Sequence, residues 1–168
     1  MSAQTGTNKE FKISGLFTAE DLIAAQRIHR IPAIRRIRIV AAVILAAGVA
    51  RLALARQPDG IVLLCAGAAA LASEAFTAYV LLPSRARKLH AQQADFHEPV
   101  CYSWDDEAVE ARGFGGQSRR LWAHYVKVQE GPDTILLYHN DQLYEAIPKR
   151  WFADASQLEA FIKLARRI

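Results

Sequence analysis

The sequence predicts an α+β protein in which a transmembrane two-helix hairpin carries a small antiparallel β-sheet domain closed by a C-terminal helix. Three observations lead to this fold class. Two long apolar stretches, 39–55 and 61–82, are separated only by the polar segment 56–60. From Phe96 onward, apolar residues alternate with polar ones, as in half-buried strands. The final segment, 156–168, repeats its apolar residues with the period of a helix.

The N-terminal segment, 1–33, is expected to hold a strand and an amphipathic helix. Phe11 and Ile13 alternate with polar residues, which predicts a strand over 11–16. Thr18 and Asp21 have the spacing of a helix capping box. An amphipathic helix should follow, and Pro32 is expected to bend or end it.

The segment 34–90 is expected to form the transmembrane hairpin. At about 1.5 Å per residue, the two apolar stretches would span roughly 25 Å and 33 Å, against a hydrocarbon core of about 30 Å. Basic residues flank the pair on both outer sides: Arg27, Arg30, Arg35, Arg36 and Arg38 before it, and Arg85, Arg87 and Lys88 after it. This positive excess predicts a multi-pass protein of the bacterial inner (cytoplasmic) membrane, with both termini in the cytoplasm.

Two charges interrupt the apolar stretches, and we expect them to differ in role. Arg51 is close enough to the connecting segment to reach the far interface with its long side chain. Pairing the helices about Pro58 puts Glu74 opposite residue 42, so no ion pair with Arg38 or Arg51 is expected. Glu74 is therefore a candidate intramembrane functional residue, with a protonated carboxyl or a partner on a neighbouring chain as the alternatives.

A soluble alternative to the hairpin is a pair of Ala-rich helices buried in a globular core. Small residues such as those in the segment 66–70 suit close helix packing in either setting. A chain of 168 residues has little remaining sequence with which to surround two such helices. We therefore favour the membrane interpretation.

The C-terminal segment, 96–168, is expected to form an antiparallel meander of about five strands and a helix. The expected strands cover residues 100–104, 109–111, 121–129, 135–138 and 143–147. The longest of them, 121–129, would place Trp122, His124, Val126 and Val128 on one face. Ser156 and Glu159 have capping-box spacing, and Leu158, Phe161, Ile162 and Ala165 form the apolar stripe of the final helix.

No arrangement of residues in the sequence supports catalysis, a metal ion or another cofactor. Gly113, Gly115 and Gly116 lack the Lys-Ser pair of a phosphate loop, and a hairpin loop explains them better. Asp105–Glu107 are consecutive carboxylates at a turn, which converge poorly on one ion. His124 has no carboxylate or nucleophile placed beside it by the sequence. We expect a protein that is not an enzyme.

Four cations of the C-terminal segment are candidate contacts for lipid headgroups or a partner: Arg119, Arg120, Lys149 and Arg150. An ordinary solvated charged surface is the alternative explanation. Residues 96–168 carry nine Lys and Arg against eleven Asp and Glu, without a stripe of interleaved basic and aromatic residues. We therefore expect no nucleic-acid partner.

A set of residues in the C-terminal third resembles the C-terminal domain of the bacterial YcxB-like family. The residues are Trp122, Lys127, Val128, Glu130, Leu136, Leu137, Tyr138, Ile147, Pro148, Lys149, Arg150 and Phe152. The resemblance implies two membrane helices followed by a small domain similar to pleckstrin-homology-like folds, and it supplies no catalytic residues. Trp151 departs from the smaller residue that is common in the family at this position.

Three functions remain open at this point. The first is an uncharacterised integral membrane protein that presents a cytoplasmic interaction or regulatory domain. The second is a lipid- or small-ligand-binding module at the membrane surface. The third is an accessory subunit of a transport or envelope complex. The expected partners are the lipid bilayer and a protein partner or second copy of the chain that contacts the membrane helices.

Overall fold

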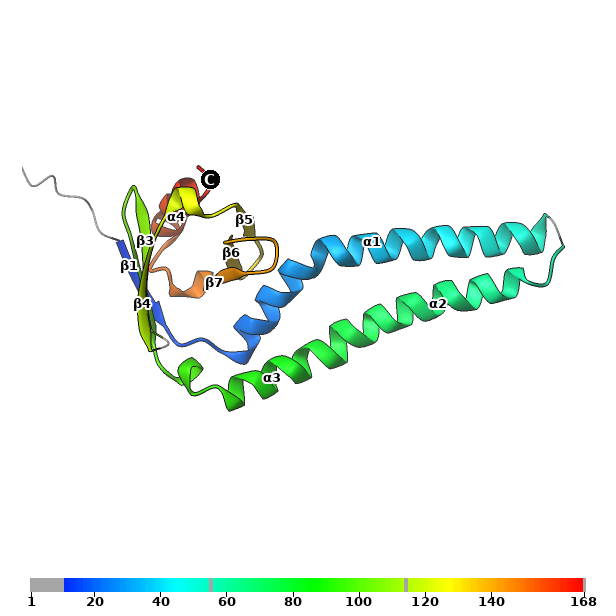
Figure 1. Ribbon diagram of the computed structural model, residues 1–168, viewed down its shortest axis with the longest axis horizontal. Coiled ribbons are helices and arrows are strands. Elements are labelled where there is room, and N and C mark those ends of the chain that lie inside the picture. Colours follow the sequence, from blue (N-terminus) through cyan, green and yellow to red (C-terminus); the bar gives the residue numbers. More distant parts are fainter. Residues whose placement is uncertain (1–10, 55, 114, 168) are drawn as a thin grey trace, which may run out of the picture. The chain divides into compact units, whose positions relative to one another are not determined.

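The computed structural model describes residues 11–54, 56–113 and 115–167, and it divides the chain into two compact units. The first unit contains the chain up to Ala25 together with Arg87–Ile168, and the second consists of Gln26–Ala86. Both boundaries fall inside helices. The predicted α+β class, with antiparallel sheets and a C-terminal helix, is confirmed (Figure 1).

The described strands of the first unit form two antiparallel sheets. One sheet has the order β1-β2-β3-β4, and the other has the order β5-β6-β7. The strands are β1 (Phe11–Gly15), β2 (Val100–Trp104), β3 (Ala108–Gly113), β4 (Gly116–Leu121), β5 (Lys127–Glu130), β6 (Thr134–Tyr138) and β7 (Tyr144–Pro148). The prediction of one five-stranded meander is therefore wrong, because the chain changes sheets after β4.

Strand β1 pairs with β2, so the strand predicted near the N-terminus belongs to the same sheet as the C-terminal strands β2, β3 and β4. Ile13 lies opposite Tyr102, and Phe11 lies opposite Trp104. The rings of Phe11 and Trp104 stack with their centroids 5.8 Å apart. Because β1 precedes the long helices and β2 follows them, this pairing joins two parts of the chain that are distant in sequence.

The expected strand 121–129 is interrupted where the chain leaves the first sheet. Residues Trp122–His124 form a 3-10 turn between β4 and β5. The turn buries the indole of Trp122, whose N–H donates to the carbonyl of Asp105 over 2.9 Å, while His124 is exposed. The prediction that these two residues share a strand face is therefore wrong. One buried aromatic residue in a turn produced the same apolar spacing as a strand.

The glycine segment after β3 is a tight hairpin connection, as the hairpin explanation predicted. Gly113 lies opposite Gly116 in the β3–β4 register. Gly113 and Gly115 have φ angles of 143° and 71°, which side-chain-bearing residues rarely adopt. Glycine is therefore required here by the backbone of the turn.

Helix α4 (Ala155–Ala165) closes an aromatic core. Phe161 is fully buried and meets Trp104 and Trp122 edge to face, with ring centroids 4.8 Å and 5.4 Å apart. Ala165 is also buried, and the other members of the predicted stripe, Leu158 and Ile162, pack against the same core. The apolar stripe is therefore confirmed, and it packs against a core rich in aromatic rings.

The two predicted capping boxes have different outcomes. Thr18 and Asp21 form theirs: the N–H of Asp21 donates to Thr18 Oγ1 over 3.2 Å, and the N–H of Thr18 donates to Asp21 Oδ2 over 2.8 Å. The box at Ser156 is wrong, because α4 begins earlier. Its N-cap is Asp154, which accepts from the N–H of Gln157 over 2.8 Å.

The second unit consists of long helices. Helix α1 (Ala19–Ala53) continues through Pro32, so of the two predicted outcomes, a bend or an end of the helix at this proline, the end is excluded. One missing N–H does not stop a helix whose turns are hydrogen-bonded on both sides. Helices α2 (Gly60–Phe76), η1 (Thr77–Leu81) and α3 (Leu82–Gln92) follow one another without a break, and η1 is one turn of π-helix.

Helices α1 and α2 run antiparallel and touch at glycines (Figure 1). A Cβ on Gly48 would lie 2.9 Å from the carbonyl oxygen of Gly60, and one on Gly67 would lie 2.6 Å from Leu45 Cγ. Side chains at these glycines would force the helices apart. The small residues therefore set the helix–helix contact within the chain.

Within the described residues, one helix is long and apolar enough to cross a membrane by length and composition: Gly60–Gln92, of 33 residues. Only 11% of its most apolar window is buried in the structure. Helix α1 does not meet the same criterion. Its apolar stretch is bordered by Arg38 and contains Arg51, which shortens the uncharged part.

Candidate functional site

Glu74 is buried in the second unit and pairs with Arg38. Both carboxylate oxygens lie 3.4 Å from Arg38 Nη2. The Glu74 side chain is 7% exposed, whereas that of Arg38 is 64% exposed. The expectation that Glu74 has no partner within its own chain is therefore wrong.

The positions at which the two helices end explain why Glu74 reaches Arg38. Helix α1 stops at Ala53 and α2 starts at Gly60, so the connection is centred before Pro58. This shift moves Glu74 along α1 from residue 42 towards Arg38, and the long arginine side chain covers the remaining distance. Hydropathy marks the apolar stretches but does not define the last helical residue, which sets the register of an antiparallel pair.

Arg51 binds the connection between the two helices. Its Nε donates to Asp59 Oδ1 over 3.1 Å and its Nη2 to Asp59 Oδ2 over 2.6 Å, while Nη2 also donates to Gln57. This fork geometry suits a guanidinium and a carboxylate. The two charges that interrupt the apolar stretches are thus each paired inside the second unit.

Arg119 and Lys149, two of the predicted headgroup contacts, both face acidic partners. Arg119 lies 3.6 Å from Asp105, and Lys149 Nζ donates to Glu130 over 2.7 Å. The hydrogen bond from Lys149 holds the pKa of Glu130 below its usual value. At Asp105, burial alone would raise the pKa of the carboxyl group. Hydrogen bonds from backbone N–H groups and the charge of Arg119 outweigh burial, so the pKa of Asp105 is lower than its usual value. Arg119 thus connects β4 to the turn between β2 and β3, and Lys149 connects the 3-10 helix η4 (Lys149–Trp151) to the end of β5.

Arg150 links the C-terminal domain to the start of α1. Its Nη2 lies 2.6 Å from Asp21 Oδ2 and also donates to the carbonyl of Leu16 over 2.8 Å. Asp21 is 8% exposed and already accepts from Thr18, so one carboxylate both caps the helix and holds Arg150. The sequence held both residues but gave no sign that they meet across 129 positions.

Arg120, the fourth predicted cation, lies on the core face of the edge strand β4. It is opposite Val109, which in turn is opposite the buried Trp104. Its Nε is buried without a hydrogen-bond partner in the described part of the chain. The four cations thus have four different surroundings, and the structure brings none of them into a shared cluster through any contact among the described residues.

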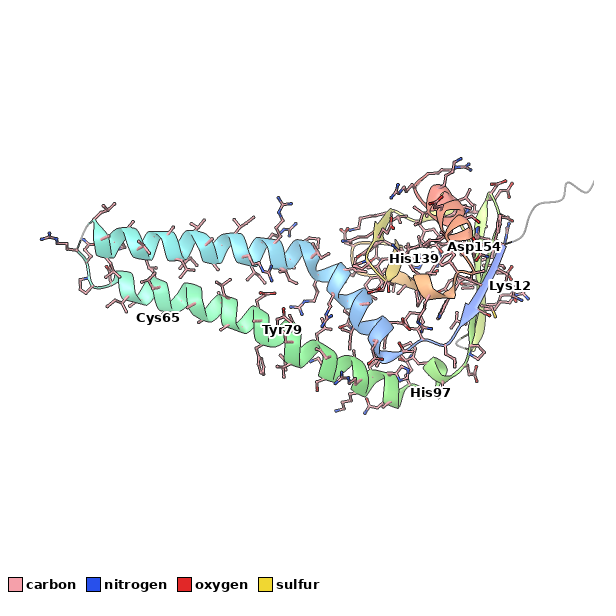
Figure 2. The ribbon with its side chains drawn as sticks, turned by 180° about the vertical axis from the view of Figure 1, so that it is seen from behind. Lys12, Cys65, Tyr79, His97, His139 and Asp154 are labelled. Carbon is pink, nitrogen blue, oxygen red and sulfur yellow. The ribbon has the colours of Figure 1, made fainter. Side chains whose placement is uncertain are left out.

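A half-buried polar network surrounds Glu145 of β7. His139 Nε2 lies 2.9 Å from Glu145 Oε1, and the hydroxyl of Tyr125 donates to Oε2 over 3.1 Å. The rings of Tyr125 and His139 stack at 5.0 Å. Figure 2 shows His139 within the body of the first unit, and its side chain is 10% exposed.

The electrostatics of this network keep its phenols neutral. Burial, reinforced by the charge of Glu145, raises the pKa of Tyr102 well above its usual value. Burial and the hydrogen bond to Glu145 do the same for Tyr125, against an opposing effect of Arg120. Two buried nitrogen atoms, His139 Nδ1 and Arg120 Nε, have no partner among the described residues. Arg120 Nε carries a hydrogen and is a donor, whereas the role of His139 Nδ1 depends on the tautomer of the ring. Arg120 Nε is therefore the donor in this region that a ligand oxygen could satisfy.

Sequence reasoning missed this network because its members are far apart in the sequence and two of them lie outside regular elements. His139 falls in the turn between β6 and β7, and Tyr125 falls between the 3-10 turn and β5, within the interrupted strand 121–129. A signal was present in the spacing of His139 and Glu145, which flank the β6–β7 turn at positions that a hairpin brings together. No group of three or more potential metal ligands occurs in the described residues.

The comparisons with known proteins bear on the C-terminal part of the chain. Residues 104–165 match the family model described as YcxB-like protein. No curated protein and no solved structure matches the chain. The chain therefore carries a YcxB-like domain whose match covers β3 to β7 and α4 and begins at the last residue of β2, while β1 and the long helices lie outside it.

Proposed function

We propose that this chain is a membrane-anchored protein whose YcxB-like domain serves a non-catalytic interaction or regulatory role in the bacterial cytoplasm. In this proposal, α1 and the helix 60–92 form a transmembrane hairpin, and both termini lie in the cytoplasm. The observation that carries it is the pairing of β1 with β2.

The pairing constrains any membrane topology. Strands β1 and β2 belong to one sheet, so residues 15 and 100 must lie on the same side of a bilayer. The chain between them therefore crosses an even number of times. If the helix 60–92 crosses once, the preceding segment must cross as well, and α1 is the described helix that can do so. Pairing of Arg38 with Glu74 supports this by neutralising the charges.

Exposed apolar side chains on both helices support a lipid environment over a soluble core. Val43 of α1 and Val62 of α2 are 64% and 67% exposed. Tyr79 and Cys65 lie on the outer surface of the second helix (Figure 2). A soluble protein would have to cover this apolar surface, whereas a bilayer solvates it directly.

A pleckstrin-homology-like fold for the first unit is part of the proposal. The four-stranded and three-stranded antiparallel sheets and the closing helix α4 support it. Domains of this kind of architecture present loops and strand edges to partners, and function resides in sites on such folds rather than in the fold itself.

The decisive experiment combines carbonate extraction of membranes with reporters fused to each terminus. We expect the full chain to remain in the membrane pellet, with both reporters active on the cytoplasmic side only. Release by carbonate would exclude the transmembrane anchor. A periplasmic signal at one terminus would contradict the even number of crossings.

Binding of a small acidic ligand is a second candidate function, favoured by the positive charge of Arg120 and its unpartnered Nε–H donor. An oxygen of such a ligand would accept from this donor. Thermal unfolding of the full chain with phosphate and dicarboxylates tests this, and Arg120→Gln should abolish any stabilisation. The proposal of an accessory subunit in a transport or envelope complex is less well supported, because Glu74 pairs with Arg38 of its own chain and does not need a partner on another chain.

A further inference from the structure

One face of α1 forms a cationic depression of about 390 Å³ that the function proposed above does not use. It is lined by Arg27, Ile31, Ile34, Arg35 and Arg38. These positions recur every three or four residues, so they occupy a single side of the helix. Guanidinium groups lie at both ends of this face, and two isoleucines lie between them.

The depression carries excess positive charge. Arg38 shares the carboxylate of Glu74, but Arg27 and Arg35 have no acidic partner within 4 Å among the described residues. Unpaired arginines on one face repel each other and favour an anion. Because a guanidinium matches two oxygens of a phosphate, the anion best suited to this face is a phosphate ester.

The apolar residues in and beside the depression indicate which kind of phosphate compound would bind there. Ile31 is 53% exposed inside the depression. Directly after Arg38, the exposed residues Ile39, Val40 and Val43 continue along the same helix. A free phosphate would leave this surface bare, whereas an anionic phospholipid would place its phosphate on the arginines and its acyl chains along the valines and isoleucines.

We propose that the face of α1 made by Arg27, Ile31, Ile34, Arg35 and Arg38 binds the headgroup of an anionic phospholipid. This inference rests on the proposed membrane location. It assigns lipid recognition to α1 instead of the C-terminal cations Arg119, Lys149 and Arg150, which have acidic partners of their own.

The test uses the full chain, purified in detergent, with phosphatidylglycerol and phosphatidylcholine of identical acyl chains as probes. Native mass spectrometry should show selective binding of phosphatidylglycerol. Arg27→Gln with Arg35→Gln should weaken that binding by about fivefold per arginine removed. Arg30→Gln with Arg36→Gln is the matched control, since it removes the same charge from the same helix without touching the depression, and it should retain the selectivity.

Three outcomes would overturn the proposal: no preference of the unmodified chain for phosphatidylglycerol, equal losses in the two double variants, or displacement of the lipid by inorganic phosphate at equal concentration. Helix content by circular dichroism checks that both variants are folded. Carbonate extraction distinguishes a failure of the headgroup site from a failure of the membrane anchor. A chain that stays in the membrane but does not select the anionic lipid refutes only the headgroup site, and a chain that is extracted refutes the anchor.

Discussion

Replacing Gly15 with alanine should disrupt the contact that holds β1 against the domain. A Cβ at this position would lie 2.1 Å from Trp151 Nε1 and 2.4 Å from both Cδ1 and Cε2. The indole is 8% exposed and packs edge to face on Phe17, with centroids 5.5 Å apart. A rigid ring held on its other side cannot yield by more than an ångström, so either the strand or the ring must move.

The loss in the free energy of unfolding can be bounded from the two possible responses, movement of the strand and movement of the indole ring. Overpacking a core by one methyl group typically costs about 1–3 kcal/mol, and losing a buried tryptophan from its site costs about 3–5 kcal/mol. With a urea dependence of about 2 kcal/mol per molar, a loss of about 2 kcal/mol lowers the unfolding midpoint by about 1 M. Because all three tryptophans, Trp104, Trp122 and Trp151, lie in this unit, their fluorescence reports its unfolding in the full chain.

Gly116→Ala is the matched control, because it makes the same backbone change at a strand end with nothing within 4 Å of the new Cβ. It should be neutral or stabilising by up to about 1 kcal/mol. Equal midpoints for the two variants would refute the packing of Gly15 on Trp151. A smaller penalty for Gly15→Ala when Trp151 is also changed to leucine would identify the ring as the obstacle.

Three further outcomes are expected. Asp21→Asn and Arg150→Gln should each destabilise the first unit, with a coupling of about 1 kcal/mol in a double-mutant cycle by urea unfolding; strict additivity would mean that the ion pair contributes nothing. Arg38→Gln should lower the amount of chain recovered in membranes because it leaves Glu74 buried and unpaired, and adding Glu74→Gln should restore it; failure to restore would exclude the pairing. Burial raises the pKa of Tyr138 to about 12, so the stability it contributes is intact below pH 10 and is lost as the pH rises from about 10 to 12. The tyrosinate absorbance of Tyr138 at 295 nm should therefore appear near pH 12 in the folded chain, or earlier once the chain unfolds, and ionisation of Tyr138 near pH 10 in the folded chain would contradict its burial.

The sequence was sufficient for the features that depend on local pattern. Alternation identified β1 and β2, a short apolar run between two turns identified β6, and the Thr18–Asp21 spacing identified the start of α1. These features need only a few neighbouring residues. The same local reasoning failed at Trp122, where one buried aromatic in a turn had the spacing of a strand residue.

The candidate sites were harder to predict because they depend on distant contacts. Arg150 looked like a surface cation until the fold brought it to Asp21, and Glu74 looked unpaired until the helix ends fixed its register. Side chains as long as arginine reach partners one helical turn away from the expected position. Small errors in element boundaries therefore change which charges are paired, although they leave the fold class unchanged.

The pairing of β1 with β2 also affects how the protein is made. Strand β1 leaves the ribosome first and must wait, unpaired, until both long helices have been synthesised and β2 follows. In the proposed topology, a chain that inserted only one helix would leave β1 across the bilayer from its partner, and β2 would present an open edge that invites aggregation or proteolysis. Closure of this sheet would thus act as a checkpoint, since only a correctly inserted anchor lets the domain finish folding.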